Sequence, residues 1–173
     1  ASRGLGDVYK SQRYGTYPFA GLARCGFIAM DILNSFVSEN IITKNDKEIF
    51  LQNVDTVASK IKHDSLKLSK NNFIKLYGHL RPNTYEITSK NYEEGYNEFF
   101  SKNKNFLNSK IIKFKLKATQ IKKISQFLKV NKLDINYKEL LLFIKKSISY
   151  REYSKFVFTK SIDGVFKNLK VLG

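Results

Sequence analysis

Apolar residues recur at helical spacing along most of this chain, and this periodicity is the feature that most constrains its fold. In one stretch the apolar positions are Ile49, Phe50, Val54, Val57 and Ile61, which is the 3.6-residue rhythm of an amphipathic helix. Strict alternation of apolar and polar residues, typical of half-buried strands, is scarce, and no internal repeat or Pro/Gly-rich linker interrupts the pattern. The sequence therefore predicts an all-α fold of six or seven helices.

Boundary signals place the first helices. Pro18 suits the first turn of a helix over residues 18–40, whose apolar residues cover almost every face and predict a buried helix. Thr43, followed three positions later by Asp46, forms a capping-box pattern at the start of a helix over 43–68.

A short helix should follow, from a cap at Ser69 to Tyr77, with Gly78 in the left-handed C-cap conformation. Its end opens the one ordered loop that we predict, at about 78–91. Further helices are predicted from about Asn91, over 117–133 and over 136–172, with Ser161 as a candidate start of a separate last helix.

Length and composition limit the class of protein. With 173 residues and 42% hydrophobic content, the chain can bury one ordinary core, so we predict one helical domain over 13–173. No stretch approaches 18 consecutive apolar residues and no signal-peptide pattern occurs, so we predict no membrane association. The single cysteine, Cys25, allows no disulfide framework and fits a reducing, cytoplasmic compartment.

The net charge of +16 raises the question of nucleic-acid binding. The lysines are scattered rather than gathered into a stripe, and charge alone gives only salt-sensitive, sequence-blind affinity, so we rank a nucleic-acid-binding domain last. Only five of the 31 basic residues are Arg. Since Arg supplies a planar fork that grips carboxylates or phosphates at two points, an Arg kept in a Lys-rich chain indicates a geometric requirement.

The first twelve residues, ASRGLGDVYKSQ, differ from the rest in being polar and glycine-containing. They resemble the translation of a sequencing-library adapter. We expect residues 1–12 to be a non-native leader, with a native flexible tail as the alternative. On the first expectation the native protein begins further upstream and the chain is a fragment.

Catalytic motifs are absent from the rest of the sequence. Cys25, His63 and His79 lack metal-ligand spacing, and there is neither a phosphate-binding glycine loop nor a nucleophile motif. Asp64 beside His63 is interpreted as a solvated surface pair. We therefore predict no catalytic residue and no metal ligand in this chain.

One stretch stands out, YGHLRPNTYEI at 77–87, because it gathers rare residue types on a loop. Pro82 restricts the residue before it to extended backbone. One interpretation is a helix end followed by a rigid turn that only packs. The other is an anion or substrate contact made by His79, Arg81 and Tyr85, since loops on rigid scaffolds often carry function. The residues alone leave both open.

Three stretches together resemble a known family: PFAGLAR-GFIA, YGHLRPNTYEITS--Y-E and REYSKFVFTKSIDG. They are similar to the helical middle region of phosphoenolpyruvate-utilising phosphotransferases, the phosphoenolpyruvate synthase-like enzymes related to rifampin phosphotransferase. The similarity spans about residues 15–166. Asn83 stands where the family more commonly has Gly, and Glu86 where it has Asp.

The resemblance implies one part of a larger multidomain enzyme. Such an enzyme has an ATP-grasp domain that uses ATP and Mg, and a mobile phosphohistidine domain, and neither motif set occurs here. The helical region would bind an anionic or pyruvate-like acceptor, or contact the visiting domain, through His79, Arg81, Tyr85 and Arg24. His79 is not assigned as the phosphocarrier, because the Thr/Ser-x-His turn of that domain is missing. A non-catalytic helical interaction module is the alternative.

Overall fold

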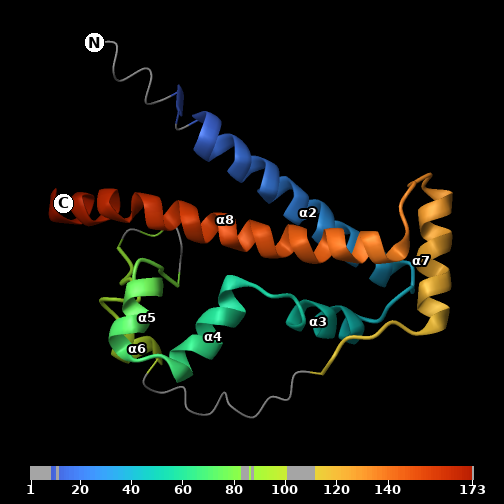
Figure 1. Ribbon diagram of the computed structural model, residues 1–173, viewed down its shortest axis with the longest axis horizontal. Coiled ribbons are helices and arrows are strands. Elements are labelled where there is room, and N and C mark those ends of the chain that lie inside the picture. The colour runs from blue at the N-terminus through green and yellow to red at the C-terminus, as the bar shows by residue number, and fades with distance from the viewer. Residues whose placement is uncertain (1–8, 11, 83–85, 87, 101–111, 173) are drawn as a thin grey trace. The chain divides into compact units, whose positions relative to one another are not determined.

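The computed structural model describes residues 9–10, 12–82, 86, 88–100 and 112–172, and within these it contains helices and no strands, which confirms the all-α prediction. The seven α-helices also agree with the predicted number. In chain order the elements are the π-helical turn η1 (Gln12–Thr16) and the helices α2 (Tyr17–Ser38), α3 (Lys44–Gln52), α4 (Val57–Lys67), α5 (Lys70–Tyr77), α6 (Tyr96–Phe100), α7 (Ala118–Val130) and α8 (Tyr137–Leu172) (Figure 1).

These elements group into two compact units. Unit 1 comprises Ala1–Thr56 and Lys110–Arg151, and unit 2 comprises Val57–Ser109 and Glu152–Gly173. Helix α8 supplies its first part to unit 1 and its second part to unit 2. The one-domain prediction for 13–173 stays a prediction, and most of the leader predicted over 1–12 lies outside the described residues.

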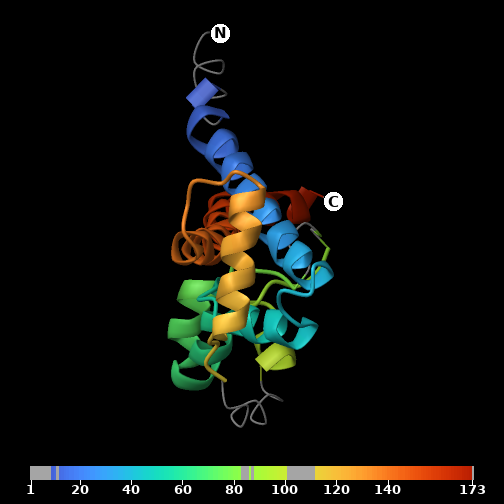
Figure 2. The same cartoon turned by 90° about the vertical axis from the view of Figure 1, so that its right-hand side faces the viewer.

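Unit 1 has a core of aliphatic and aromatic side chains from all four of its α-helices. Helix α7 crosses α2 (Figure 2), and the rings of Phe36 on α2 and Phe127 on α7 meet edge to face with centroids 5.4 Å apart. On α3, Phe50 is 1% exposed and packs edge to face on Phe114 at 5.1 Å. The buried members are Ala29, Leu33, Phe36, Ile41, Ile42, Phe50, Val54, Ile124, Leu128, Leu140 and Ile144.

Unit 2 is held by aromatic rings. Phe73 on α5 is fully buried, and its ring lies 5.1 Å from Tyr77, 5.5 Å from Tyr96 and 4.8 Å from Phe100, measured between centroids. The ring of Phe156, on the second part of α8, completes the cluster against Tyr77 at 6.1 Å. Each such pair contributes about 0.5–1.5 kcal/mol beyond the area that it buries.

The helix predicted over 43–68 is broken in the structure into α3 and α4, and Asn53 is the reason. Its backbone N–H closes α3 on the carbonyls of Ile49 and Phe50, and its side-chain amide donates to the carbonyl of Ile112 at 2.7 Å. The amide oxygen accepts from the N–H of Phe114 at 3.3 Å. This asparagine therefore stabilises the 112–114 segment instead of extending α3.

The candidate helix start at Ser161 is also wrong, because α8 runs through it without interruption (Figure 1). The hydroxyl of Ser161 donates to the carbonyl of Phe158, one turn back in the same helix, at 2.7 Å. A serine inside a helix commonly makes this bond instead of capping.

Helix α2 is buried on one face only, so the prediction of a helix buried on every side is wrong. Gly26, Ala29, Leu33 and Phe36 face the core, whereas Phe27 is 56% exposed. The helical run Gln12–Ser38 is the one described helix whose length and composition suit a membrane crossing, with a mean hydropathy of 1.3 over 18 residues. Core helices and signal sequences meet the same criterion, so the absence of a membrane span stays a prediction.

Candidate functional site

The candidate loop begins at the end of α5. Ser69 caps this helix and Tyr77 ends it, as predicted. Gly78, however, is not left-handed, since its φ of −56° and ψ of −32° lie in the right-handed helical region. A Cβ at this position would lie 2.5 Å from the carbonyl oxygen of Ile74 and 3.2 Å from the Cβ of Glu93. A side chain at this position would therefore meet the last turn of α5 first and the returning segment second, and the predicted left-handed C-cap is wrong.

The two ends of the loop are joined by backbone hydrogen bonds. The N–H of Tyr92 donates to the carbonyl of Leu80 at 2.8 Å, and the N–H of Glu93 donates to that of Gly78 at 3.1 Å. These bonds fix the positions of residues 78–81 on one side and 91–93 on the other. The loop therefore starts and ends on an ordered frame.

Asn91 anchors the returning side of the loop. Its side-chain oxygen accepts from the N–H of Glu94 at 2.8 Å, while the Glu94 carboxylate accepts from the N–H of Asn91 at 3.0 Å. Asn91 is fully buried, and its side-chain Nδ2 has no hydrogen-bond partner among the residues that the structure describes. The residues that follow form a turn, so the helix predicted from about Asn91 begins only at Tyr96.

His79 points into unit 2. The residue is 9% exposed, and its ring contacts that of Phe156 with centroids 4.9 Å apart. Burial lowers the pKa of His79, and the backbone hydrogen bond to Phe156 and the charge of Asp163 oppose this effect only in part. The buried Nε2 has no hydrogen-bond partner in the described part of the chain. We therefore treat His79 as a neutral imidazole at pH 7.

Arg81 is also buried, with 3% of its side chain exposed. Its Nη1 lies 3.7 Å from Oδ1 of Asp163 on α8. The other oxygen of Asp163 lies 3.2 Å from the ammonium of Lys167, which in turn contacts Glu93 at 3.1 Å. A row of alternating charges thus links the loop to α8 within unit 2, which is the arrangement expected if the loop packs.

A small cavity of about 200 Å³ adjoins Arg81. Its wall includes Leu80, Pro82 and Tyr92 from the loop region, and Glu152 and Lys155 from α8 contribute one charge of each sign. The guanidinium therefore has a carboxylate partner and a neighbouring space of small-molecule size. The carboxylate partner agrees with a loop that only packs, and the neighbouring cavity agrees with a loop that binds an anion.

The structure does not test the other two predicted site residues, Tyr85 and Arg24. Tyr85 lies outside the described residues. Arg24 is exposed on α2 in unit 1, which is a separate unit from the one that carries His79 and Arg81. The roles predicted for Arg24 and Tyr85 stay predictions.

The sequence missed a polar contact between α4 and α5. The hydroxyl of Tyr77 donates to Oδ2 of Asp64 at 2.7 Å, while Oδ1 of the same carboxylate lies 3.1 Å from Nδ1 of His63. Burial and this hydrogen bond raise the pKa of Tyr77 to about 12, and the same bond is the main cause that lowers the pKa of Asp64. The predicted surface pair of His63 and Asp64 is present, and Asp64 is in addition a structural acceptor for Tyr77.

No group of three or more His, Cys, Asp or Glu side chains among the described residues is arranged to hold a metal ion. Cys25 is a half-buried free thiol. The sequence matches no family model, and neither the curated proteins nor the solved structures include a significant match.

Proposed function

We propose that this chain is the helical acceptor-binding or interdomain region of a phosphoenolpyruvate synthase-like phosphotransferase. The ATP-grasp domain, with its ATP and Mg, and the phosphohistidine domain would lie elsewhere in the same cytoplasmic polypeptide. The transfer of the phosphoryl group requires metal-held phosphates and a positioned nucleophile. This chain would contribute acceptor binding or domain contact.

The observation that supports the proposal most is the environment of Arg81. It lies in the loop whose sequence resembles the family, its backbone neighbours are joined to 92–93, and it adjoins a cavity of about 200 Å³. A guanidinium in a site with little water binds a carboxylate more strongly than a solvent-exposed guanidinium does. A pyruvate-like acceptor would place its carboxylate there, with the neutral ring of His79 behind the loop.

A second candidate, a non-catalytic helical interaction module, is favoured by the position of Asp163. This carboxylate faces Arg81 at 3.7 Å, and the guanidinium is almost fully covered. In that case the charges of the loop serve only to fix it on α8. The two candidates differ in what substitution of Arg81 does to an acceptor.

The first experiment is to extend the reading frame on both sides and assay the longer protein. Adjacent ATP-grasp and phosphohistidine domains, and AMP formation that depends on ATP and pyruvate, would support the proposal. We expect the 173-residue chain alone to form no AMP. If extension yields neither domain, the interaction module replaces the phosphotransferase.

The second experiment compares Arg81→Lys with Asp163→Asn in the extended enzyme. Loss of a two-point charged contact to the acceptor should lower kcat/KM by about ten- to a hundredfold for Arg81→Lys. Asp163→Asn should lower thermal stability without a comparable loss of kcat/KM. If the two variants lose stability alike and keep full activity, Arg81 is structural and the acceptor site is elsewhere.

A further inference from the structure

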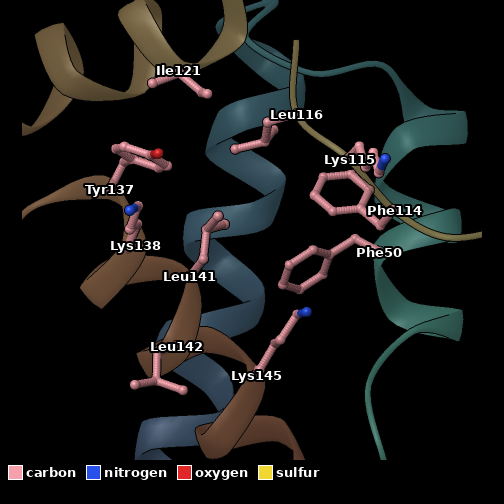
Figure 3. A pocket seen from close by; sticks show the side chains of 10 residues that line it. All are labelled: Phe50, Phe114, Lys115, Leu116, Ile121, Tyr137, Lys138, Leu141, Leu142 and Lys145. Carbon is pink, nitrogen blue, oxygen red and sulfur yellow. The ribbon is translucent and has the colours of Figure 1, made fainter. Parts of the chain in front are cut away.

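Unit 1 contains a cavity that has no part in the function proposed above. Its volume is about 500 Å³, which lies within the range typical of small-molecule sites. Figure 3 shows its wall, which is built from α3, α7, the segment that precedes α7 and the start of α8. The lining residues are Phe50, Phe114, Lys115, Leu116, Ile121, Tyr137, Lys138, Leu141, Leu142 and Lys145.

The wall of this cavity is mainly apolar. The rings of Phe50 and Phe114, in edge-to-face contact at 5.1 Å, form one side of it. Across the cavity, α8 presents Leu141 and Leu142, and Leu142 is 52% exposed (Figure 3). An exposed leucine at the mouth of an apolar cavity leaves hydrophobic surface in water, and a bound hydrocarbon chain would remove that surface.

The charges that line the cavity are all positive. Lys138 and Lys145 lie about two helical turns apart on the same face of α8, with Leu141 between them, and Lys115 comes from the opposite segment. Among the described residues, neither Asp nor Glu lines the cavity. Among the described ion pairs, none involves these three ammonium groups.

Lys145 is the lysine whose position is best defined. Its ammonium lies 5.5 Å from the centroid of the buried Phe50 ring, a cation–π contact that holds the charge beside the apolar wall. Figure 3 shows the ammonium groups of Lys115, Lys138 and Lys145 at separate places around the cavity, so an anion beside Lys145 would be attracted by the other two at longer range. It would also relieve the mutual repulsion of like charges that line one space.

We propose that this cavity binds a single-chain amphipathic carboxylate, such as a fatty acid anion. The hydrocarbon chain lies against Phe50, Phe114 and Leu141, and the carboxylate lies beside the ammonium of Lys145. The positive charge of the lysines repels cationic amphiphiles, and the apolar wall disfavours small hydrophilic anions. The proposal does not depend on the phosphotransferase assignment, because the cavity belongs to unit 1 and the candidate loop to unit 2.

The test is calorimetric titration of the full chain with dodecanoate, kept below its micellar concentration. Butanoate and dodecyltrimethylammonium serve as controls for chain length and for charge. We expect one saturable site for dodecanoate. Binding of butanoate should be more than about a hundredfold weaker, because each buried CH₂ is worth about 0.8 kcal/mol. The cationic amphiphile should not compete for the site.

Matched lysine variants locate the site. Lys145→Gln should weaken dodecanoate binding by about two- to fivefold, as expected for one partly exposed charge pair. Lys146→Gln, an exposed neighbour with the same change in charge, should leave it unchanged. The triple variant Lys115→Gln, Lys138→Gln and Lys145→Gln should lose more than about tenfold, with thermal unfolding used to verify that each variant is folded.

Several results would overturn the proposal. The first is the absence of saturable dodecanoate binding, and the second is binding of dodecyltrimethylammonium as tight as that of dodecanoate. The third is a loss of dodecanoate affinity in Lys146→Gln as large as that in Lys145→Gln. Binding to anionic phospholipid vesicles without binding of free dodecanoate would assign the surface to a membrane instead. A concentration-dependent dimer in sedimentation velocity that Leu142→Glu dissociates would assign it to a second copy of the chain.

Discussion

Replacing Tyr77 with Phe removes one hydroxyl and leaves the aromatic contacts of unit 2 in place. The lost interaction is the 2.7 Å hydrogen bond to the carboxylate of Asp64. Hydrogen bonds to charged groups contribute about 1.5–3 kcal/mol, and we take the lower part of that range because water reaches Asp64, whose side chain is 27% exposed. We therefore expect Tyr77→Phe to lower the free energy of unfolding by about 1–2 kcal/mol, or the Tm by about 2–8 °C.

The pH dependence of this loss has a defined sign. The pKa of Asp64 is lowered from 3.8, so its contribution is complete above the unfolded value and is lost as pH falls through the folded pKa. The pKa of Tyr77 is raised from 10.0 to about 12, so its contribution is complete below pH 10 and is lost as pH rises toward 12. The difference between wild type and Tyr77→Phe should be constant between about pH 5 and 9 and should shrink at both extremes.

The assay is thermal unfolding followed by circular dichroism across this pH range. Tyr92→Phe is the matched control, since it removes the same atom from a partly buried tyrosine whose pKa is raised by burial alone. It should change stability by less than about 0.5 kcal/mol. Asp64→Ala and the double variant complete a mutant cycle. A Tyr77→Phe protein as stable as wild type at pH 7, or a loss that does not shrink below pH 4, would refute the reasoning.

Four further substitutions are tested by denaturant unfolding. Thr43→Ala should cost about 1 kcal/mol, because the hydroxyl accepts from the N–H of Asp46 at 3.0 Å at the start of α3. Phe50→Ala should cost about 3–5 kcal/mol, because the side chain is 1% exposed and the cavity left behind cannot fill. Gly78→Ala should destabilise by about 1–3 kcal/mol through contact with the carbonyl oxygen of Ile74, whereas Gly21→Ala, with open space around it, should stabilise by about 0.5–1 kcal/mol. A stabilising Gly78→Ala would contradict the close approach seen in unit 2.

Features that depend on neighbouring residues could be predicted from the sequence. The capping box of Thr43 and Asp46 is present in both directions, and Ser69 caps α5, because each pattern involves residues at most three positions apart. The number of helices also agrees, although the predicted 43–68 helix is divided into α3 and α4 and the candidate last helix at Ser161 is part of α8. These predictions used no knowledge of tertiary packing.

Features that depend on distant partners were missed. Asn53 breaks the predicted 43–68 helix through bonds to Ile112 and Phe114, about sixty positions further along the chain. Gly78 has a backbone conformation that other residues adopt as well, and a Cβ there would meet the carbonyl oxygen of Ile74 first and the Cβ of Glu93 second. The sequence does not mark Asn53, and it marks Gly78 for a conformation that the residue does not have.

The rarity of arginine in this lysine-rich chain favours anion binding as an interpretation, and the structure shows other reasons for an arginine. Arg81 is buried beside Asp163, and the guanidinium of Arg151 lies 4.7 Å from the ring centroid of Phe27. A guanidinium is more weakly hydrated than an ammonium and stacks on rings, so either position favours Arg without any ligand. Rarity of arginine therefore indicates a covered or stacked cation, and anion binding is one cause among several. If Arg81 binds the acceptor, Arg81→Lys should lose more activity than Asp163→Asn, because both variants disturb the pair between Arg81 and Asp163 but only the first changes the guanidinium. The two variants therefore have to be measured side by side.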